Sequence, residues 1–452
     1  MCVVDSLWLP QASARSVRRL SASAAGGCGA PECGTGICAG TSSAVGSGSK
    51  LGAAASAYPK RVAKNMSAAA AGATRPATAP AAAATLPSPS SIFNSSSPSA
   101  QASLAHISSL LNSREPGKTL PAALYLDESV YAAELALLWN RGWLFAGYTN
   151  QLPKAGNYFT YEIGDESLII IRSEEGTNGG GGSEGKIQAF HNSCRHRGSR
   201  IVTATQETQH THRLVCPYHQ WSYARDGSLV HARDMGAGFN KEDNALHEVH
   251  LEEVEGLIFI CLTPKAQKPM WDFAPARALM SKQLKPHSLA RGSKIAYSAN
   301  YTINSNWKLV YENNRECYHC AGSHPEYVKS NYDLHLTYNQ KPDGTYERAL
   351  DPTYPAKEKV LAYIESKSKD WESMGFACSP DSSFPGDGWY RASRMPLKEG
   401  WVTESMDGQP VSSIMGNLPQ RDMGSFRIHT LPNVRHEESQ HYAKGVHEKA
   451  SA

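Results

Sequence analysis

Residues 194–221 read CRHRGSRIVTATQETQHTHRLVCPYHQW and contain two short segments that each pair a cysteine with a histidine. In the first segment Cys194 stands two residues before His196, and in the second Cys216 stands three residues before His219. Residues 197–215 separate the two segments, which is enough chain for each to form its own loop. Two thiolates and two imidazoles presented by two loops are a donor set for iron or zinc.

This donor set predicts a Rieske [2Fe–2S] cluster, in which two imidazoles replace two thiolates on one of the irons. The neutral imidazoles reduce the negative charge of the cluster, so it accepts an electron more readily than a cluster with four thiolates. A structural zinc site is the alternative, but its usual spacings combine CxxC with HxxxH. The mixed CxH and CxxH segments favour the cluster, with Cys194, His196, Cys216 and His219 as its ligands.

A second candidate metal site follows in residues 306–325, NWKLVYENNRECYHCAGSHP. Glu316 and His319 are three residues apart and share one face of a helix. His324 falls on a different face of a regular helix, so the two imidazoles meet at one metal only if the helix is interrupted, for which Gly322 is suited. Two histidines with one carboxylate form the facial triad of non-haem Fe(II) oxygenases. The alternative is a helix with histidines in its core.

The composition excludes several classes of protein. The net charge is +3 over 452 residues, but the basic excess lies in residues 1–104, so the remainder is slightly acidic. A nucleic-acid-binding body should be basic, which disfavours that class. The longest apolar runs, Leu168–Ile171 and Leu257–Leu262, are too short to span a membrane, which predicts a soluble protein. Ten cysteines are too few for a disulfide scaffold and indicate a reducing compartment.

The character of the sequence changes several times along the chain. Residues 1–104 are rich in Ala, Ser, Gly and Pro with few acids, which indicates an organellar transit peptide or, alternatively, plain disorder. Many short strands with turn residues between them then predict an antiparallel β domain. The expected parts after the transit peptide are a helical segment (105–142), the antiparallel β domain (143–265), a linker (266–293), a catalytic α+β domain (294–433) and a polar tail (434–452).

Apolar runs and turn residues also predict individual elements. Asp127 is the expected N-cap of a helix over 128–139, and Asp226-Gly227 is the expected turn of a hairpin. A further helix is expected over 307–321. Strands are expected at Tyr158–Ile163, Ser167–Ile171, Lys186–His191, Leu229–Ala232, Leu257–Leu262, Lys294–Ile303 and Ser425–Leu431.

With both motifs present, residues 120–433 resemble the large (alpha) subunit of Rieske non-haem iron oxygenases. The segments that carry the likeness are CRHRG, CPYHQW, NWKLVYENNRECYHC and GNLPQRDMGSFRIHTLPN. The chain is most similar to the branch acting on quaternary ammonium compounds, which includes choline monooxygenase, glycine betaine demethylase, and stachydrine and carnitine oxygenases. This resemblance implies an α+β fold in which a helix-grip catalytic domain follows the antiparallel Rieske domain.

The resemblance also implies roles for individual residues. His319 and His324 would bind a mononuclear non-haem Fe(II), with Asn313 near that iron. Glu316 would bridge His319 and the residue equivalent to His219 in a neighbouring subunit. That bridge implies a homotrimer in which the cluster of one subunit reduces the iron of the next. A ferredoxin or a flavin reductase would supply the electrons.

The reaction implied is hydroxylation, by O2 and two electrons, of a carbon next to a cationic nitrogen. Choline would give betaine aldehyde hydrate, whereas glycine betaine or stachydrine would lose an N-methyl group. A quaternary ammonium has no N–H donors, so aromatic faces should surround it, with Trp371, Trp389, Tyr390 and Trp401 as candidates. The expected location is the chloroplast stroma, with the mitochondrion as the alternative.

The third iron ligand of this family is an aspartate on a C-terminal helix, and no matching residue precedes the end of this sequence. Family-like sequence stops at Asn433, which predicts a C-terminally truncated chain. Glu437, Glu438 or water would then complete the iron site of an active oxygenase. The alternative function is a truncated, catalytically inactive Rieske protein for electron transfer or assembly.

Overall fold

The computed structural model describes a large part of the chain, and all of the described residues belong to one compact unit. They are residues 98–115, 118–174, 185–205, 207–290, 293–295, 303–313, 319–323, 325–332, 336–340, 346–350, 355–376, 389–405, 407–410 and 412–439. Most of the expected transit peptide, residues 1–97, lies outside them, and helix α2 already begins at Pro98. No helix in these ranges is both long and apolar enough to cross a bilayer.

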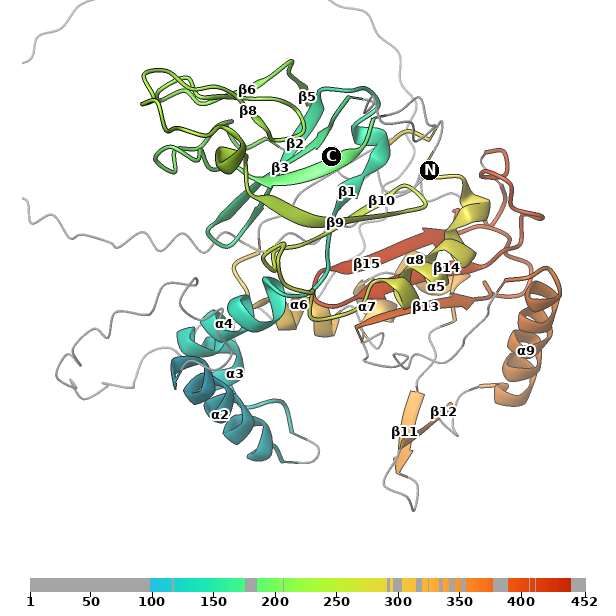
Figure 1. The fold of residues 1–452 in the computed structure, drawn as a ribbon. Helices are drawn as coiled ribbons and strands as arrows, with labels where there is room; N and C mark the ends of the chain where they lie inside the picture. The colour runs from blue at the N-terminus through green and yellow to red at the C-terminus, as the bar shows by residue number, and fades with distance from the viewer. Residues whose placement is uncertain are drawn as a thin grey trace, which may run out of the picture. The chain divides into compact units, whose positions relative to one another are not determined.

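The described residues between 98 and 139 are mostly helical (Figure 1). The helices are α2 (Pro98–Asn112), α3 (Ala123–Leu126), α4 (Glu128–Glu134) and the π-helical turn η1 (Leu135–Trp139). The Asp127 carboxylate accepts a hydrogen bond from the Ser129 N–H at 2.8 Å, so it caps α4 as the sequence predicted. The predicted helix over 128–139 is confirmed, although its last turn is π-helical rather than α-helical.

Two antiparallel sheets form the β domain (Figure 1). The larger sheet has the order β1-β10-β9-β4-β3-β2-β5 and the smaller one the order β6-β7-β8. The strands are β1 (Leu144–Tyr148), β2 (Asn157–Ile163), β3 (Glu166–Arg172), β4 (Ile187–His191), β5 (Gln209–His210), β6 (Leu214–Val215), β7 (Ser222–Tyr223), β8 (Leu229–His231), β9 (Glu248–Val254) and β10 (Leu257–Cys261). Short 3-10 turns lie at Thr149–Gln151, Glu242–Asn244 and Lys285–His287. All five strands that the sequence predicted between residues 143 and 265 are present.

Strand β3 is buried on both faces, which explains its continuous apolar run. Leu168 and Ile170 point into a core inside the large sheet. Ile169 and Ile171 point into a second core between this sheet and the loops that carry Cys194 and Cys216. A strand buried on both faces does not alternate polar and apolar residues.

Strand β9 was not predicted from the sequence, because its residues EVHLEEV are mostly charged or polar. Only Val249 and Val254 are buried within it. The strand exists because β10 and β4 both pair with its main chain. Main-chain pairing between two neighbours tolerates charged side chains on the face that is open to solvent.

The second region consists of the described residues from 274 to 439, which form helices, a two-stranded hairpin and a three-stranded sheet. The helices are α5 (Ala274–Leu284), α6 (Trp307–Asn313), α7 (Cys320–Ser323), α8 (Pro325–Ser330) and α9 (Lys357–Ser373). A hairpin joins β11 (Leu336–Gln340) and β12 (Tyr346–Leu350), and the sheet contains β13 (Tyr390–Met395), β14 (Ser425–Thr430) and β15 (Val434–Ser439). The predicted strand at 425–431 is confirmed as β14. The strand expected at 294–303 lies mostly outside the described residues, and so does the middle of the helix expected over 307–321.

Two predicted boundaries differ from the observed elements. The chain after Asn433 forms β15, which pairs with β14 from Thr430↔Val434 to Ser425↔Ser439, so the sheet continues into the expected polar tail. The expected linker over 266–293 contains α5, whose Ala276 and Met280 are fully buried. Neither β15 nor α5 shows a clear apolar period in its sequence. Strand β15 is held by main-chain pairing, which needs no such period, and α5 is buried along only part of its surface.

One hydrophobic core joins the β domain to the second region. Phe259 on β10 packs in the same cluster as Trp389, Phe426 and Met280. The ring centroids of Trp271 and Trp389 lie 5.5 Å apart with nearly parallel planes. The two regions therefore share buried apolar surface rather than touching only through polar side chains.

Asn433 adds a polar clamp between the two regions. Its Oδ1 accepts the Phe145 N–H at 3.0 Å, and its Nδ2 donates to the Phe145 carbonyl at 3.0 Å and to the Tyr161 hydroxyl at 3.1 Å. We expect Asn433→Ala to lower the free energy of unfolding by about 2 kcal/mol, because it leaves buried main-chain groups of β1 without partners. Chemical denaturation measures the loss. Asn417→Ala, which removes one exposed bond to Ser288, is the control, and an equal effect in both variants would contradict the clamp.

Candidate metal centres

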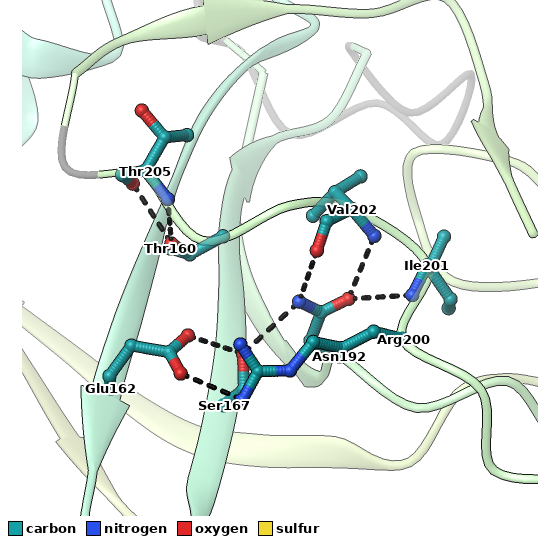
Figure 2. A network of polar contacts seen from close by, with 8 residues as sticks. All are labelled: Thr160, Glu162, Ser167, Asn192, Arg200, Ile201, Val202 and Thr205. Carbon is teal, nitrogen blue, oxygen red and sulfur yellow. Dashed lines mark hydrogen bonds and ion pairs between the residues drawn. The ribbon is translucent and has the colours of Figure 1, made fainter. Parts of the chain in front are cut away.

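The first cysteine–histidine loop is closed at its base by Asn192, a buried residue at the end of β4 (Figure 2). Its Oδ1 accepts the N–H groups of Ile201 and Val202, both at 3.0 Å. Its Nδ2 donates to the Val202 carbonyl at 2.8 Å and to the Ser167 hydroxyl at 3.1 Å. One amide side chain thus joins both ends of the loop and attaches them to β3.

Strand β2 supports the same loop from the other side (Figure 2). Glu162 accepts the Ser167 hydroxyl at 2.5 Å and forms an ion pair with Arg200 at 3.0 Å. Thr160 donates its hydroxyl to the Thr205 carbonyl and accepts the Thr205 N–H at 2.9 and 2.6 Å. These contacts fix the outgoing end of the loop against the large sheet.

Each of the two candidate ligand loops contains a turn of the same kind. The carbonyl of Cys194 accepts the N–H of Gly198 at 2.9 Å, and the carbonyl of Cys216 accepts the N–H of Gln220 at 3.0 Å. Both accepting turns end on a residue with positive φ, +68° at Gly198 and +61° at Gln220. The left-handed conformation turns each chain back sharply, and a non-glycine residue such as Gln220 adopts it at a cost in energy.

All four candidate cluster ligands are brought together. The Cys194 and Cys216 side chains are buried in one cluster at 3% and 2% exposure. The imidazole of His196 lies 4.7 Å, centroid to centroid, from that of His219 and stacks on Trp221 at 4.9 Å. His219 is exposed at the surface of the domain. The structure therefore presents two inner thiols and two outer imidazoles.

The chemistry of these groups fits metal binding. Both thiols are outside any disulfide bond, and burial raises the pKa of Cys194, as does the adjacent Cys216 thiol. Two neighbouring thiolates in a buried site need a compensating cation, which iron supplies. Burial also lowers the pKa of His196, helped by His219 and Arg197, and so favours the neutral ring that binds metals. The buried Nδ1 of His196 has no hydrogen-bond partner among the described residues.

The donor set suits a two-iron cluster better than a single zinc ion. A structural zinc ion usually takes its four ligands from CxxC and HxxxH spacings, whereas this site combines CxH with CxxH. A [2Fe–2S] cluster needs only two protein ligands at each iron, and two thiols with two imidazoles meet that requirement.

Tyr223 is a further residue of this site that the sequence analysis missed. Its hydroxyl oxygen accepts the Arg195 N–H at 3.0 Å and lies 3.3 Å from the Cys194 sulfur. Burial, followed by the hydrogen bond to Cys194, raises the pKa of Tyr223, so the hydroxyl keeps its proton and can donate it to the sulfur. Its position two residues after Trp221, in a strand that continues the second loop, was the available signal.

The second candidate metal centre is described in part. Glu316 and His324 lie outside the described residues, and Asn313 is the exposed last residue of α6. His319 is half-buried, and its carbonyl accepts the N–H groups of Gly322 and Ser323 at the start of α7. The roles of these residues at an iron site remain predictions. Glu437 and Glu438, considered as substitute ligands, lie in β15 opposite Arg427 and Phe426.

The aromatic residues predicted to surround a substrate cation do not line one cage. Trp389 and Tyr390 pack in the core shared with the β domain, and Trp401 lies against Gly408 of its own loop. Trp371 is fully buried in a different cluster, where Arg394 lies with its guanidinium carbon 6.0 Å from the ring centroid. Trp371, Trp389 and Tyr390 are thus core residues, and Trp371 does not face Trp389 across one cage. Trp401 is partly exposed and stays a prediction.

Two family models match the chain. The Rieske [2Fe-2S] domain model matches residues 142–250, and the model of the ring hydroxylating alpha subunit (catalytic domain) matches residues 287–441. The second match extends past the boundary expected at 433, in agreement with β15. Together the matches confirm the predicted order of domains and the two predicted cofactors, a [2Fe–2S] cluster and a mononuclear non-haem iron.

Similar proteins come from bacteria. The glycine betaine monooxygenase oxygenase subunit of Chromohalobacter salexigens is 38% identical over 318 residues, which cover 70% of this chain and 64% of the relative. The carnitine monooxygenase oxygenase subunit of Escherichia coli is 31% identical over 214 residues, which cover 47% of this chain and 54% of the relative. The chain thus spans just under two thirds of the first relative.

A solved structure of naphthalene 1,2-dioxygenase from Rhodococcus sp. bound to indole aligns over 76% of each chain, with 21% identity and a TM-score of 0.43. The two consecutive domain matches and the sequence similarity to oxygenase subunits agree with the donor loops described above. By its Rieske domain and its ring-hydroxylating catalytic domain, the chain belongs to the alpha subunits of Rieske oxygenases.

Proposed function

We propose that this chain is the oxygenase subunit of a Rieske monooxygenase that hydroxylates a small quaternary ammonium compound. The convergence of two buried thiols with two facing imidazoles on a β domain carries this proposal. Cys194, His196, Cys216 and His219 would hold the cluster, and His319 and His324 the mononuclear iron. When bound, the cluster supplies single electrons and the mononuclear iron activates O2.

The residues of the chain would set up this chemistry in different ways. Asn192 and Glu162 hold the first ligand loop in shape, while the buried position of the thiols keeps water from that side of the cluster. Glu316 would relay electrons between His219 of one subunit and His319 of another. Its carboxylate is a suitable group for holding two imidazoles in fixed orientation.

The proposed substrate class rests on the relatives. The glycine betaine and carnitine oxygenase subunits act, by their names, on compounds with a trimethylammonium group. We infer that the substrate of this chain is choline, glycine betaine, stachydrine or carnitine. N-demethylation would release formaldehyde, whereas hydroxylation of choline at its carbinol carbon would give betaine aldehyde hydrate.

We infer that the functional assembly is a homotrimer fed by a ferredoxin or a flavin reductase. The surface around the exposed His219 supports a docking role, because Tyr218, whose ring lies 3.8 Å from that of His219, is 59% exposed and Val215, in the strand that leads into the same loop, is 46% exposed. Exposed apolar side chains next to a redox ligand are typical of a surface that another protein covers. Light scattering of the purified chain would give its oligomeric state.

The proposed function is tested with the purified, iron-reconstituted protein. We expect two irons and two sulfides for the cluster, a third iron per chain, and O2 uptake with one of the four ammonium compounds. Formaldehyde or aldehyde analysis then identifies the reaction. Cluster iron without a third iron and without O2 uptake would instead support an electron-transfer or assembly protein. Zinc without sulfide would refute both.

Replacement of Tyr223 should change the reduction potential of the cluster. The Tyr223 hydroxyl, 3.3 Å from the Cys194 sulfur, would stabilise the reduced cluster, which is the more negative state. Tyr223→Phe removes that hydroxyl. One hydrogen bond of about 1.4 kcal/mol corresponds to a potential lower by about 60 mV for one electron. Redox titration monitored by electron paramagnetic resonance measures it. Tyr158→Phe, a change in the same core away from the thiols, is the control, and equal potentials in parent and Tyr223→Phe would contradict the role.

We propose the chloroplast stroma as the location, with the mitochondrion as the alternative. The Ser- and Ala-rich composition of residues 1–104, with few acids, supports an organellar destination. A fluorescent protein fused after residue 104 and expressed in plant cells should collect in plastids. Fluorescence spread through the cytosol would contradict the proposal.

A further inference from the structure

We infer that Glu134 and Lys308 are positioning residues for the mononuclear iron site, because their ion pair fixes the helix that leads into the His319 segment. This inference rests on the proposed function. It gives a role to Glu134, which lies outside both motifs, and to Lys308, which lies in the second motif without an assigned role. Glu134 ends α4 in the N-terminal helical segment, whereas Lys308 lies in the first turn of α6. The pair joins parts of the chain 174 residues apart in sequence.

The ion pair is close and largely shielded from solvent. Lys308 Nζ lies 2.5 Å from Glu134 Oε1, and each side chain is 14% exposed. The second carboxylate oxygen, Oε2, accepts the indole N–H of Trp307 at 2.8 Å. Both oxygens of Glu134 are thus used by α6, which fixes the rotation of this helix about its axis as well as its distance.

Asn306 extends the attachment to the residue before the helix. Its Oδ1 accepts the Lys308 N–H at 3.0 Å, the geometry of an N-cap, and its Nδ2 donates to the Tyr125 carbonyl at 3.0 Å. The Tyr125 hydroxyl donates to Glu312 at 2.8 Å, one helical turn further on. All three residues of the NWK sequence, followed by Glu312, therefore bind the N-terminal helices.

Aromatic packing completes the joint. The indole of Trp307 meets that of Trp139 edge to face, with centroids 5.4 Å apart, and packs against the core of the β domain. Glu134 directly precedes the π turn η1 and Trp139 is its last residue, and both contact α6. Single π turns often occur at functional positions. The start of α6 is thus held by two carboxylate contacts and one aromatic contact.

The far side of the His319 segment is also anchored. Arg427 of β14 donates to the hydroxyl of Tyr327 in α8, and the Asn331 amide donates to Glu404 at 2.7 Å. His319 comes six residues after the last residue of α6 and six residues before the first residue of α8, so a displacement of either helix would displace it. A shift of a ligand by a fraction of an ångström weakens metal binding.

A purely stabilising role for the pair is the alternative. Buried ion pairs contribute little net stability, because desolvation offsets the attraction, but they specify geometry where both partners are hydrogen-bonded. The two roles give different results. Loss of stability alone would affect the cluster and the mononuclear iron together, whereas loss of position would affect the mononuclear iron selectively.

The test uses the full chain and four variants. Lys308→Met removes the cation, Glu134→Gln/Lys308→Met removes both charges so that none is left unpaired, and Lys308→Arg is the conservative variant. Lys367→Met is the control, because Lys367 on α9 forms a partly shielded ion pair with Asp422, each side chain being about a quarter exposed (25% and 22%). Anaerobic Fe(II) titration, the spin-resonance signal of the nitric oxide adduct, the signal of the reduced cluster and hydrogen exchange over 307–323 are measured for each.

We expect Fe(II) affinity at the mononuclear site to fall about tenfold or more in Lys308→Met and in the double variant. The cluster signal should stay at the parent level, and exchange over 307–323 should be faster. Lys308→Arg should restore both readouts, and Lys367→Met should leave them unchanged. Parent-like Fe(II) binding with parent-like exchange in the double variant would overturn the inference. If the parent itself binds no third iron, the proposed function fails, and the exchange data alone then decide whether the pair holds α6.

Discussion

Cys216→Ser should yield a protein without the [2Fe–2S] cluster, without its colour and without its spin-resonance signal. The Cys216 thiol is buried beside Cys194, so a serine hydroxyl there would have to replace a thiolate in a site that excludes water. Hydroxyl oxygen is a poor ligand for Fe–S clusters, which are held by thiolates. Labile sulfide and iron analysis measure the loss, which we expect to be complete.

Cys261→Ser is the matched control for that experiment. Cys261, the last residue of β10, is also buried and outside any disulfide bond. Its sulfur lies among hydrogen-bond acceptors instead of other thiols, namely the Arg141 carbonyl and the Thr263 hydroxyl. The control should keep two irons and two sulfides in the cluster. A Cys216→Ser protein with parent-like colour and sulfide would refute the assignment of the cluster ligands.

Asn192→Ala should destabilise the β domain by about 3 kcal/mol, because it removes four hydrogen bonds and leaves buried groups without partners. Two of the lost partners are the N–H groups of Ile201 and Val202, which close the loop that carries Cys194 and His196. We therefore expect cluster content to fall together with stability. Denaturation with urea and sulfide analysis of the same preparation measure the two effects.

Asn240→Ala provides the comparison for Asn192. Asn240 is an exposed residue of the same domain, and its side chain bonds only to groups in its own short turn. Its replacement should cost less than about 1 kcal/mol and leave the cluster intact. Equal effects of the two substitutions, or an Asn192→Ala protein with full cluster content, would contradict the role of Asn192 as the closure of the loop.

Residues close together in sequence were predicted well. The spacings of Cys194, His196, Cys216 and His219 indicate a cluster, and the structure places all four in one region. The Asp127 cap and the apolar strands β3 and β10 were predicted for the same reason. Each of these signals depends on a few consecutive residues, whose geometry is set by local backbone conformation.

Contacts between distant segments were not predicted. Trp371 and Trp389 were candidates for the walls of a substrate cage, but they are buried in two different cores. Aromatic side chains are recognisable by type, whereas their burial depends on what packs against them. Strand β15 was missed because its polar sequence carries no period, while its pairing with β14 does not need one.

The sequence by itself determined the family, the two kinds of iron centre and most strands of the β domain, because covalent spacing places donors and apolar residues at fixed intervals along the backbone. Only the tertiary structure decided which uncharged or paired residues support those centres. Asn192, Tyr223 and the Glu134–Lys308 pair act through atoms brought within about 3 Å by folding. Their side chains have no distinctive spacing in the chain, so their roles follow from three-dimensional contacts alone.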